Sequence, residues 1–277
     1  MIPSGRLSSR FAGSGATGRN GGHFITLPYD GFSSRSARTS KGRDEGVLAA
    51  ELEMRTIREI RSLIKTHGWE HDVHLAENGH TRLFFTTEEE EEDLVEYTAA
   101  KKANVPWEGI SRLTKEEMFE KYGTTYPGVS IPAGSIWPVK LATKLFQFAV
   151  SEAQESSVSL QLHTHTPAEA VEPIPPNVSD SQTQMRWSVR TPRGTLKTRF
   201  VIHATNAWAA HLLPQFAMPE QKNQSSPDVD KKASPHCGTW IAPYRGQIIA
   251  TRANVPPSKL PRRAFAADWM EDYWLPK

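Results

Sequence analysis

Apolar residues recur every three to four positions from residue 44 to residue 67, and this period predicts an amphipathic helix. Gly68 follows and is expected to end it. Two stretches of alternating apolar and polar residues come next, at 72–76 and 81–87. Because the Asn78-Gly79 pair between them is typical of a tight turn, the pattern predicts a β-hairpin.

Three further helices are predicted from their first turns. Thr87 is expected to cap a helix that runs to about residue 104, and its six leading acids favour the positive end of the helix dipole. The same acids leave a metal site or a basic partner as an alternative. Thr114 and Glu117 form a capping box for a short helix that ends near residue 122. Pro138 suits the first turn of a helix that reaches about residue 153.

The remaining apolar segments are short and bounded by turn residues. They predict strands at 126–133, 157–164, 184–189 and 196–204. Residues 173–181 and 219–235 are rich in Pro, Ser, Asp and Asn and are expected to be surface loops. Strands and helices mix without strict alternation, so the predicted fold class is α/β, with α+β character. We expect the chain to form two discontinuous domains.

Composition limits the possible partners. The 33 Lys and Arg residues against 31 Asp and Glu leave a net charge of +2, so no nucleic-acid partner is expected. No apolar run approaches the roughly 18 residues of a membrane span, so no membrane partner is expected either. The one cysteine, Cys237, excludes an internal disulfide and is typical of a reducing compartment, which makes the cytoplasm the expected location.

Residues 13–18 read Gly-Ser-Gly-Ala-Thr-Gly, which matches the Gly-x-Gly-x-x-Gly motif of a dinucleotide-binding turn. That turn needs a buried strand before it and a helix after it. Residues 1–12 are rich in Ser, Arg and Gly, and Pro28 follows soon after, so neither element is expected here. The composition leaves two interpretations: a flexible glycine-rich loop, or a nest of backbone N–H groups that binds an anion.

A second polar cluster follows an apolar segment at residues 200–208, Phe-Val-Ile-His-Ala-Thr-Asn-Ala-Trp. A buried strand that ends in small and polar residues is where α/β sheets bind ligands, and Thr205 and Asn206 would supply hydrogen bonds. An ordinary strand-to-helix turn is the alternative. His163 and His165 share a strand face, but no third ligand has a suitable spacing, so no metal site is expected.

Four segments together resemble the fungal FAD-dependent oxidoreductases of the D-amino-acid oxidase type. Residues 14–23 closely resemble the flavin-contacting loop of that family, and His-Ala-Thr-Asn-Ala-Trp at 203–208 matches its strand-end motif. Residues 160–171 resemble the strand and turn that touch the adenine near Ala168. Residues 241–250 resemble the Pro-x-Arg-Gly-Gln strand beside the isoalloxazine and the substrate. The four lie in the family's order.

The resemblance implies a specific organisation. An incomplete FAD-binding Rossmann-like domain would comprise 1–43 and 157–240, and an antiparallel-sheet substrate domain would comprise 44–156 and 241–277. FAD would be the cofactor, and a small-molecule amine or amino acid would pass a hydride from its α-carbon to flavin N5.

The resemblance also implies a set of site residues. Arg245 would be the charged catalytic group near the substrate or flavin. The implied cofactor-binding residues are Ser14, Gly15, Thr17, Arg19, Asn20, Gly21, Gly22, His23, Ala168, Ala204, Thr205, Asn206, Trp208, Gly246 and Gln247.

Two parts of the family's pattern are missing from this sequence: the phosphate-binding strand-turn-helix that precedes the flavin loop, and the glycine-rich segment that closes over the flavin. We therefore expect a protein truncated at both ends. Two functions stay open: a fragment of an FAD-dependent amine or amino-acid oxidase, or an inactive product or binding pseudo-enzyme that does not hold FAD.

Overall fold

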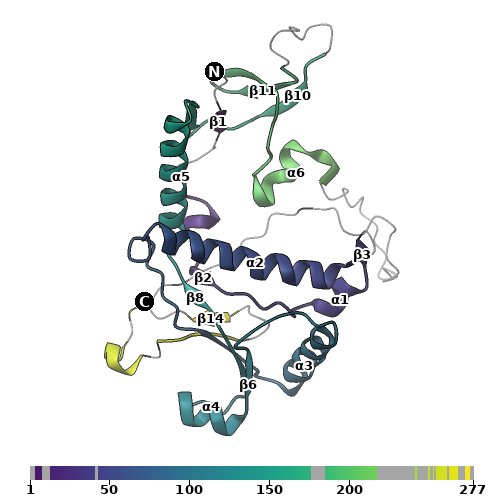
Figure 1. The fold of residues 1–277 in the computed structure, drawn as a ribbon, viewed down its shortest axis with the longest axis vertical. Coiled ribbons are helices and arrows are strands. Elements are labelled where there is room, and N and C mark those ends of the chain that lie inside the picture. The colour runs from purple at the N-terminus through teal and green to yellow at the C-terminus, as the bar shows by residue number, and fades with distance from the viewer. Residues whose placement is uncertain are drawn as a thin grey trace, which may run out of the picture. The chain divides into compact units, whose positions relative to one another are not determined.

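A computed structural model of the protein describes residues 4–7, 13–40, 43–175, 185–216, 241, 249, 252, 254–260, 262–267 and 272–274. The chain divides into two compact units (Figure 1). The first unit comprises Met1–Gly15 with Ala149–Ile249, and the second comprises Ala16–Phe148 with Ala250–Lys277. The mixture of helices with parallel and antiparallel strands agrees with the predicted α/β class.

The second unit is built on a five-stranded sheet of order β14-β13-β5-β7-β6. Its central strand β5 pairs in parallel with β13 and antiparallel with β7, and the two outer pairs are antiparallel. The bounds are β14 (Asp272–Trp274), β13 (Ala264–Ala267), β5 (His80–Leu83), β7 (Gly128–Ile131) and β6 (Ser111–Leu113). The sheet therefore joins segments from both ends of the unit's sequence.

Helices α2, α3 and α4 of this unit begin at hydrogen-bonded caps. Asp44 accepts from the backbone N–H groups of Gly46 and Val47 at the start of α2 (Glu45–Thr66). Helix α4 (Lys115–Tyr122) has the predicted Thr114–Glu117 capping box. Helix α3 (Thr87–Lys102) has its own box with Glu89, but its cap is Thr86, one residue before the predicted one. Local sequence thus determines where these helices start.

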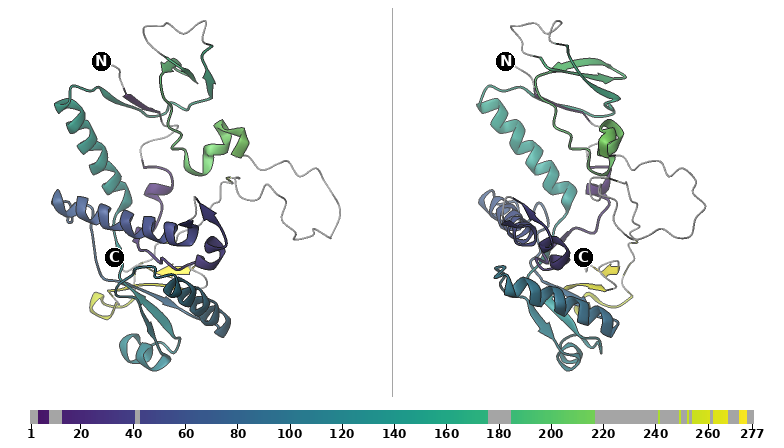
Figure 2. Two further views of the ribbon diagram at one scale, coloured as in Figure 1. Left: turned by 45° about the vertical axis from the view of Figure 1, so that its right-hand side comes forward. Right: turned by 90° about the vertical axis from the view of Figure 1, so that its right-hand side faces the viewer.

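Two other helices and two short strands also lie within residues 16–155. Helix α1 (Phe32–Ser36) packs against α2 and α3, as the views in Figure 2 show. Helix α5 (Pro138–Glu155) begins at the predicted proline. Strands β3 (Thr39–Ser40) and β4 (Arg43–Asp44) form a small antiparallel pair before α2. Within the described ranges, no helix has both the length and the apolar composition that crossing a bilayer requires.

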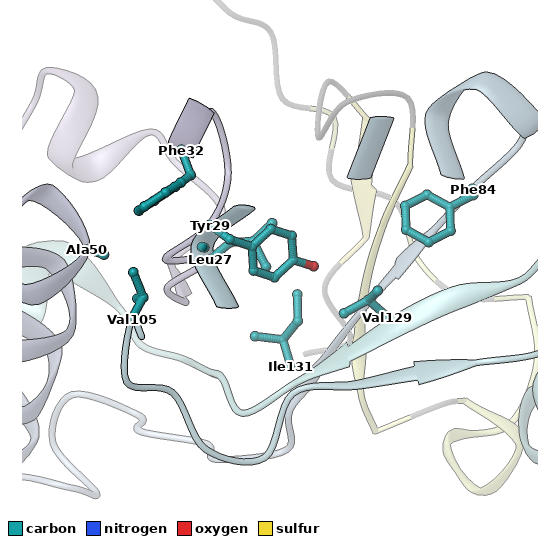
Figure 3. Packing of buried hydrophobic residues seen from close by; sticks show 9 residues of the cluster. Leu27, Tyr29, Phe32, Ala50, Phe84, Val105, Val129 and Ile131 are labelled. Carbon is teal, nitrogen blue, oxygen red and sulfur yellow. The ribbon is translucent and has the colours of Figure 1, made fainter. Parts of the chain in front are cut away.

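The core of the second unit lies between the sheet and helices α1, α2 and α3. Tyr29 is fully buried and lies among side chains of the sheet and of the neighbouring segments (Figure 3). The buried members are Leu27, Tyr29, Phe32, Ala50, Phe84, Ala100, Val105, Val129 and Ile131. This cluster holds the segment that follows residue 24 against the sheet.

The first unit contains a parallel pair and an antiparallel sheet. Strand β1 (Ser4–Leu7) pairs in parallel with β9 (Leu160–His163). Strands β10 (Ala170–Pro173), β11 (Trp187–Thr191) and β12 (Gly194–Thr198) form a three-stranded antiparallel sheet. The short helices η2 (Asn206–Trp208), α6 (Ala209–Leu212) and η3 (Pro214–Phe216) follow.

The predicted hairpin across Asn78-Gly79 is wrong. The 72–76 segment does not pair with β5; it makes one bridge, from Ala76 to Ser135. Gly79 does adopt a positive φ of 75°, as a turn requires, but β5 takes β7 and β13 as its partners. These partners lie far along the chain, so no local turn signal could identify them.

The predicted strand at 196–204 is also wrong in its second half. Strand β12 ends at Thr198, and residues 200–204 have no regular structure. Phe200 and Ile202 are 73% and 89% exposed, whereas the apolar pattern predicted burial. The physical reason is that no strand in the described ranges lies beside this segment to take its hydrogen bonds.

Candidate functional site

The glycine-rich loop adopts a defined turn that Asn20 closes. The part of the loop that belongs to the second unit starts at the short helix η1 (Ala16–Gly18). The Asn20 amide nitrogen donates to the carbonyl oxygens of Ala16 (2.8 Å) and Thr17 (3.2 Å), and its amide oxygen accepts from the Gly22 N–H (2.8 Å). Asn20 thereby joins both sides of the turn, so residues 16–22 form an ordered loop rather than a free linker.

Gly22 is required by packing. It has a φ of +79°, and a Cβ built there would lie 2.0 Å from the carbonyl oxygen of Ile136. The Gly22 carbonyl accepts from the Ile136 N–H at 2.9 Å. Strand β2 (His23–Phe24) then pairs with β8 (Gly134–Ser135). Close approach of the two backbones thus anchors the end of the loop.

His23, the last residue of the loop, contacts a buried histidine of the sheet. Its ring meets the His80 ring edge to face, with centroids 4.9 Å apart. Burial lowers the pKa of His23, and it lowers the pKa of His80 to about 3, assisted by His23, Arg263 and Arg82. His80 is fully buried, and neither of its ring nitrogens has a hydrogen-bond partner among the described residues. Both rings are therefore uncharged at neutral pH.

The rest of the loop is open to solvent. Residues 15–20 are exposed, and Ser14 and Gly21 are half-buried. Thr17 and Arg19 therefore present a hydroxyl and a guanidinium that a ligand can reach, and such groups suit phosphate or a polar ring edge. Ser14 and Gly15 belong to the first unit, and the residues from Thr17 to His23 belong to the second.

The first unit carries the other described candidates. Ala168 is half-buried in the turn between β9 and β10. Ala204, Thr205 and Asn206 are exposed, and Trp208 is 60% exposed. Thr205 precedes η2 without making a side-chain capping bond, so its hydroxyl is not used to start that helix. These groups are accessible to a ligand.

The predicted Arg-Gly-Gln site lies outside the described residues. This applies to Arg245, Gly246 and Gln247, and also to Cys237 and to residues 219–235. The roles assigned to all these residues stay predictions. In the described part of the chain, no three His, Cys, Asp or Glu side chains are placed to hold a metal ion.

Sequence reasoning did not identify a buried charged network that lies beside the hydrophobic core of the second unit. Asp93 on α3 lies 3.3 Å from Arg82 Nη1 and also binds Arg112, while the Tyr29 hydroxyl donates to it at 3.2 Å. Burial raises the pKa of Asp93, and the two arginines oppose that shift. One feature of the sequence could have indicated a charged side chain beside the core. His80 and Arg82 are two positions apart, so both lie on one face of β5.

Comparison with known proteins gives one family and one fold. The model of the FAD dependent oxidoreductase family matches residues 7–273. No curated protein matches the sequence. Glycine oxidase from Bacillus cereus ATCC 14579 is 17% identical, with a TM-score of 0.51 over 77% of this chain and 51% of that chain. L-amino acid deaminase from Proteus vulgaris is 13% identical, with a TM-score of 0.51 over 77% and 49%.

Glycine oxidase from Geobacillus kaustophilus is 22% identical, with a TM-score of 0.47 over 75% of this chain and 50% of that chain. At such identities the similarity to the Bacillus cereus and Proteus vulgaris structures shows a shared fold. The chain spans about half the length of the solved structures that it matches.

Proposed function

Because the chain belongs to the FAD-dependent oxidoreductase family, we propose that it forms part of an enzyme that oxidises an amine or an amino acid with FAD as cofactor. The observation that carries this proposal is the family match over residues 7–273, which includes all four segments that resemble flavin- or substrate-contacting elements. The substrate is a small molecule, and the near-neutral net charge does not favour a nucleic acid.

The described residues fit a flavin at the loop. Asn20 holds the turn, the exposed Thr17 and Arg19 offer donors, and Gly15 has open space around it that a Cβ would enter. In the first unit, the exposed Thr205 and Asn206 offer hydroxyl and amide groups, and Trp208 offers a ring face. These are the groups that recognise the polar edges and the aromatic ring of a nucleotide cofactor.

Bound FAD supplies the acceptor for the hydride that leaves the substrate α-carbon. The protein's own contribution is orientation and electrostatics. The uncharged His23–His80 pair behind the loop adds no positive charge there at neutral pH. Arg245 is the residue to which we assign the charge near the substrate or flavin. Residues 1–43 and 157–240 would hold FAD, and residues 44–156 and 241–277 would hold the substrate.

Two finer assignments belong to the same proposal. The Arg-Asn-Gly-Gly-His loop and the His-Ala-Thr-Asn-Ala-Trp segment support the fungal type within the family. The single cysteine supports a reducing compartment such as the cytoplasm.

One observation favours a second candidate function. Phe200 and Ile202 are exposed directly before the Ala204–Asn206 segment, so the segment lacks the strand pairing that would hold it against a cofactor. A chain in that state would be an inactive fragment or a binding pseudo-enzyme that does not retain FAD.

A spectrum of the purified chain separates the two candidates. Reconstitution with FAD followed by desalting should leave the visible absorption bands of a bound flavin if the first proposal holds. Anaerobic addition of a panel of amino acids and secondary amines should then bleach those bands with at least one substrate. A desalted protein without flavin bands supports the second candidate, and bound flavin that no amine bleaches limits the protein to cofactor binding.

A further inference from the structure

A cleft of about 410 Å³ opens in the second unit where β5 begins and β7 ends, and none of residues 16–23 lines it. Its walls include Arg61 from α2, Asn78 and Gly79 before β5, Ser130 from β7 and Arg263 before β13. A cleft of this size accommodates a small molecule. It is therefore a candidate site that the flavin proposal does not use.

Arg263 is a half-buried cation held by uncharged acceptors. Its Nη2 donates to the carbonyl oxygen of His80 (2.9 Å), to the Ser130 hydroxyl (2.5 Å) and to the carbonyl oxygen of Ile131 (3.3 Å). Among the described residues, no carboxylate lies within ion-pair distance of Arg263 and its Nη1 has no acceptor. Since a partly buried guanidinium gains more from an anionic partner than from a neutral one, this arrangement favours binding of an anion at Nη1.

The backbone around Arg263 makes room for the guanidinium. Gly79 has a positive φ, and a Cβ built there would lie 2.8 Å from the guanidinium carbon. The whole guanidinium, Nη1 included, therefore packs on Gly79. Nη2 is bound to acceptors on β5 and β7, which leaves Nη1 as the terminal nitrogen without an acceptor among the described residues.

The other charges of the cleft also favour an anion. Glu77 is the acidic residue of the lining, and it is already shared: its oxygens lie 3.1 Å from Arg61 Nε and 3.2 Å from Lys65 Nζ. Arg61 and Arg263 against Glu77 leave the lining with a net positive charge. Ser130 accepts from Arg263, so its own hydroxyl proton is available to donate.

We propose that this cleft binds a small oxyanion, a carboxylate or a phosphate, between Arg263 and Arg61. The planar guanidinium of Arg263 would bind the anion through Nη1, and Ser130 and Asn78 would add neutral hydrogen bonds. The site is independent of FAD and of the proposed oxidation, so it can be tested on the chain without cofactor.

Calorimetric titration of the full chain with inorganic phosphate, and separately with malonate, tests the proposal at an ionic strength kept constant with NaCl. We expect saturable binding of at least one ion, and the preferred ion distinguishes a phosphate site from a carboxylate site. Arg263→Lys keeps the charge but loses the planar fork, and it should raise the Kd by about tenfold or more. Arg61→Gln should weaken binding in the same direction.

Arg55→Gln is the matched control, because Arg55 lies on the same helix, is exposed and does not line the cleft. Its Kd should equal that of the parent. If Arg263→Lys does not fold, two measurements still test the proposal. They are the Kd of Arg61→Gln and the shift of the Arg263 Nε–H NMR signal when the parent protein is titrated. The proposal is overturned if neither ion binds saturably, or if Arg61→Gln and the folded Arg263→Lys bind as tightly as the parent.

Discussion

The imidazole of His23 stands edge to face on the imidazole of His80, with ring planes 89° apart and centroids separated by 4.9 Å. His23 ends the glycine-rich loop, and His80 begins the central strand of the five-stranded sheet. The contact therefore joins the candidate cofactor loop to the buried central strand of the sheet. Because the His80 ring is fully buried and the His23 ring is partly buried, their protonation is coupled to folding.

The first prediction is a loss of stability in acid that originates at His80. The pKa of His80 is about 3 in the folded protein, against an ordinary value of 6.5. Between these values the unfolded chain binds a proton that the folded protein does not, so the free energy of unfolding should fall as the pH drops from 6.5 toward 3. This histidine contributes at most about 1.4 kcal/mol per pH unit. Urea denaturation at several pH values measures it.

Replacing His80 checks that origin. His80→Leu removes two ring nitrogens that have no partner among the described residues, so stability at pH 7 should change little, and its decline in this pH range should become shallower. His71→Leu, at an exposed position, should keep the parent's pH dependence. An undiminished decline in His80→Leu would show that other groups cause it.

The second prediction concerns the buried network around Asp93. Asp93→Ala leaves Arg82 and Arg112 without their shared carboxylate, while Asp30 and Glu90 remain as longer contacts. Removing one partner from a buried ion pair costs about 3–5 kcal/mol. The urea midpoint should fall accordingly. Glu92→Ala, on the same helix but exposed, should stay within about 0.5 kcal/mol of the parent, and equal losses in both variants would contradict the prediction.

The third prediction separates two glycines of the loop. Gly22→Ala places a Cβ against the Ile136 carbonyl at a positive φ, so it should reduce stability by about 1–3 kcal/mol or more. Gly15→Ala meets no atom within 4 Å and should leave the thermal midpoint nearly unchanged. Thermal denaturation of both variants gives the comparison. A stable Gly22→Ala protein would mean that the backbones of Gly22 and Ile136 do not lie this close together.

The fourth prediction rests on the proposed cofactor. Asn20→Ala removes the bonds that close the loop, so it should raise the Kd for FAD by about tenfold while the chain remains folded. Asn20→Asp keeps the acceptor for the Gly22 N–H but loses the donors to Ala16 and Thr17, so its Kd should lie between the two. Flavin fluorescence titration measures each Kd. Identical affinities in all three proteins would remove Asn20 from the site.

Local patterns predicted the helices well. The apolar period and Asp44 determine α2, and Thr114 with Glu117 determines the start of α4. Capping involves residues at most a few positions apart, so the sequence contains all of the necessary information. The same locality explains the error at Asn78-Gly79, because a turn signal reports the bend and not the strand that the next segment will pair with.

Short-range backbone preferences and recognisable segments were enough to predict the starts of α2, α4 and α5, the mixed α/β class and the glycine-rich loop. Two contacts could be found only in the folded chain: that of His23 with His80, and the hydrogen bond from Arg263 to the His80 carbonyl across 183 positions of sequence. The physical reason is that strand pairing and burial depend on partners distant along the chain. Charge, pKa and the shape of a cleft follow from those partners rather than from composition.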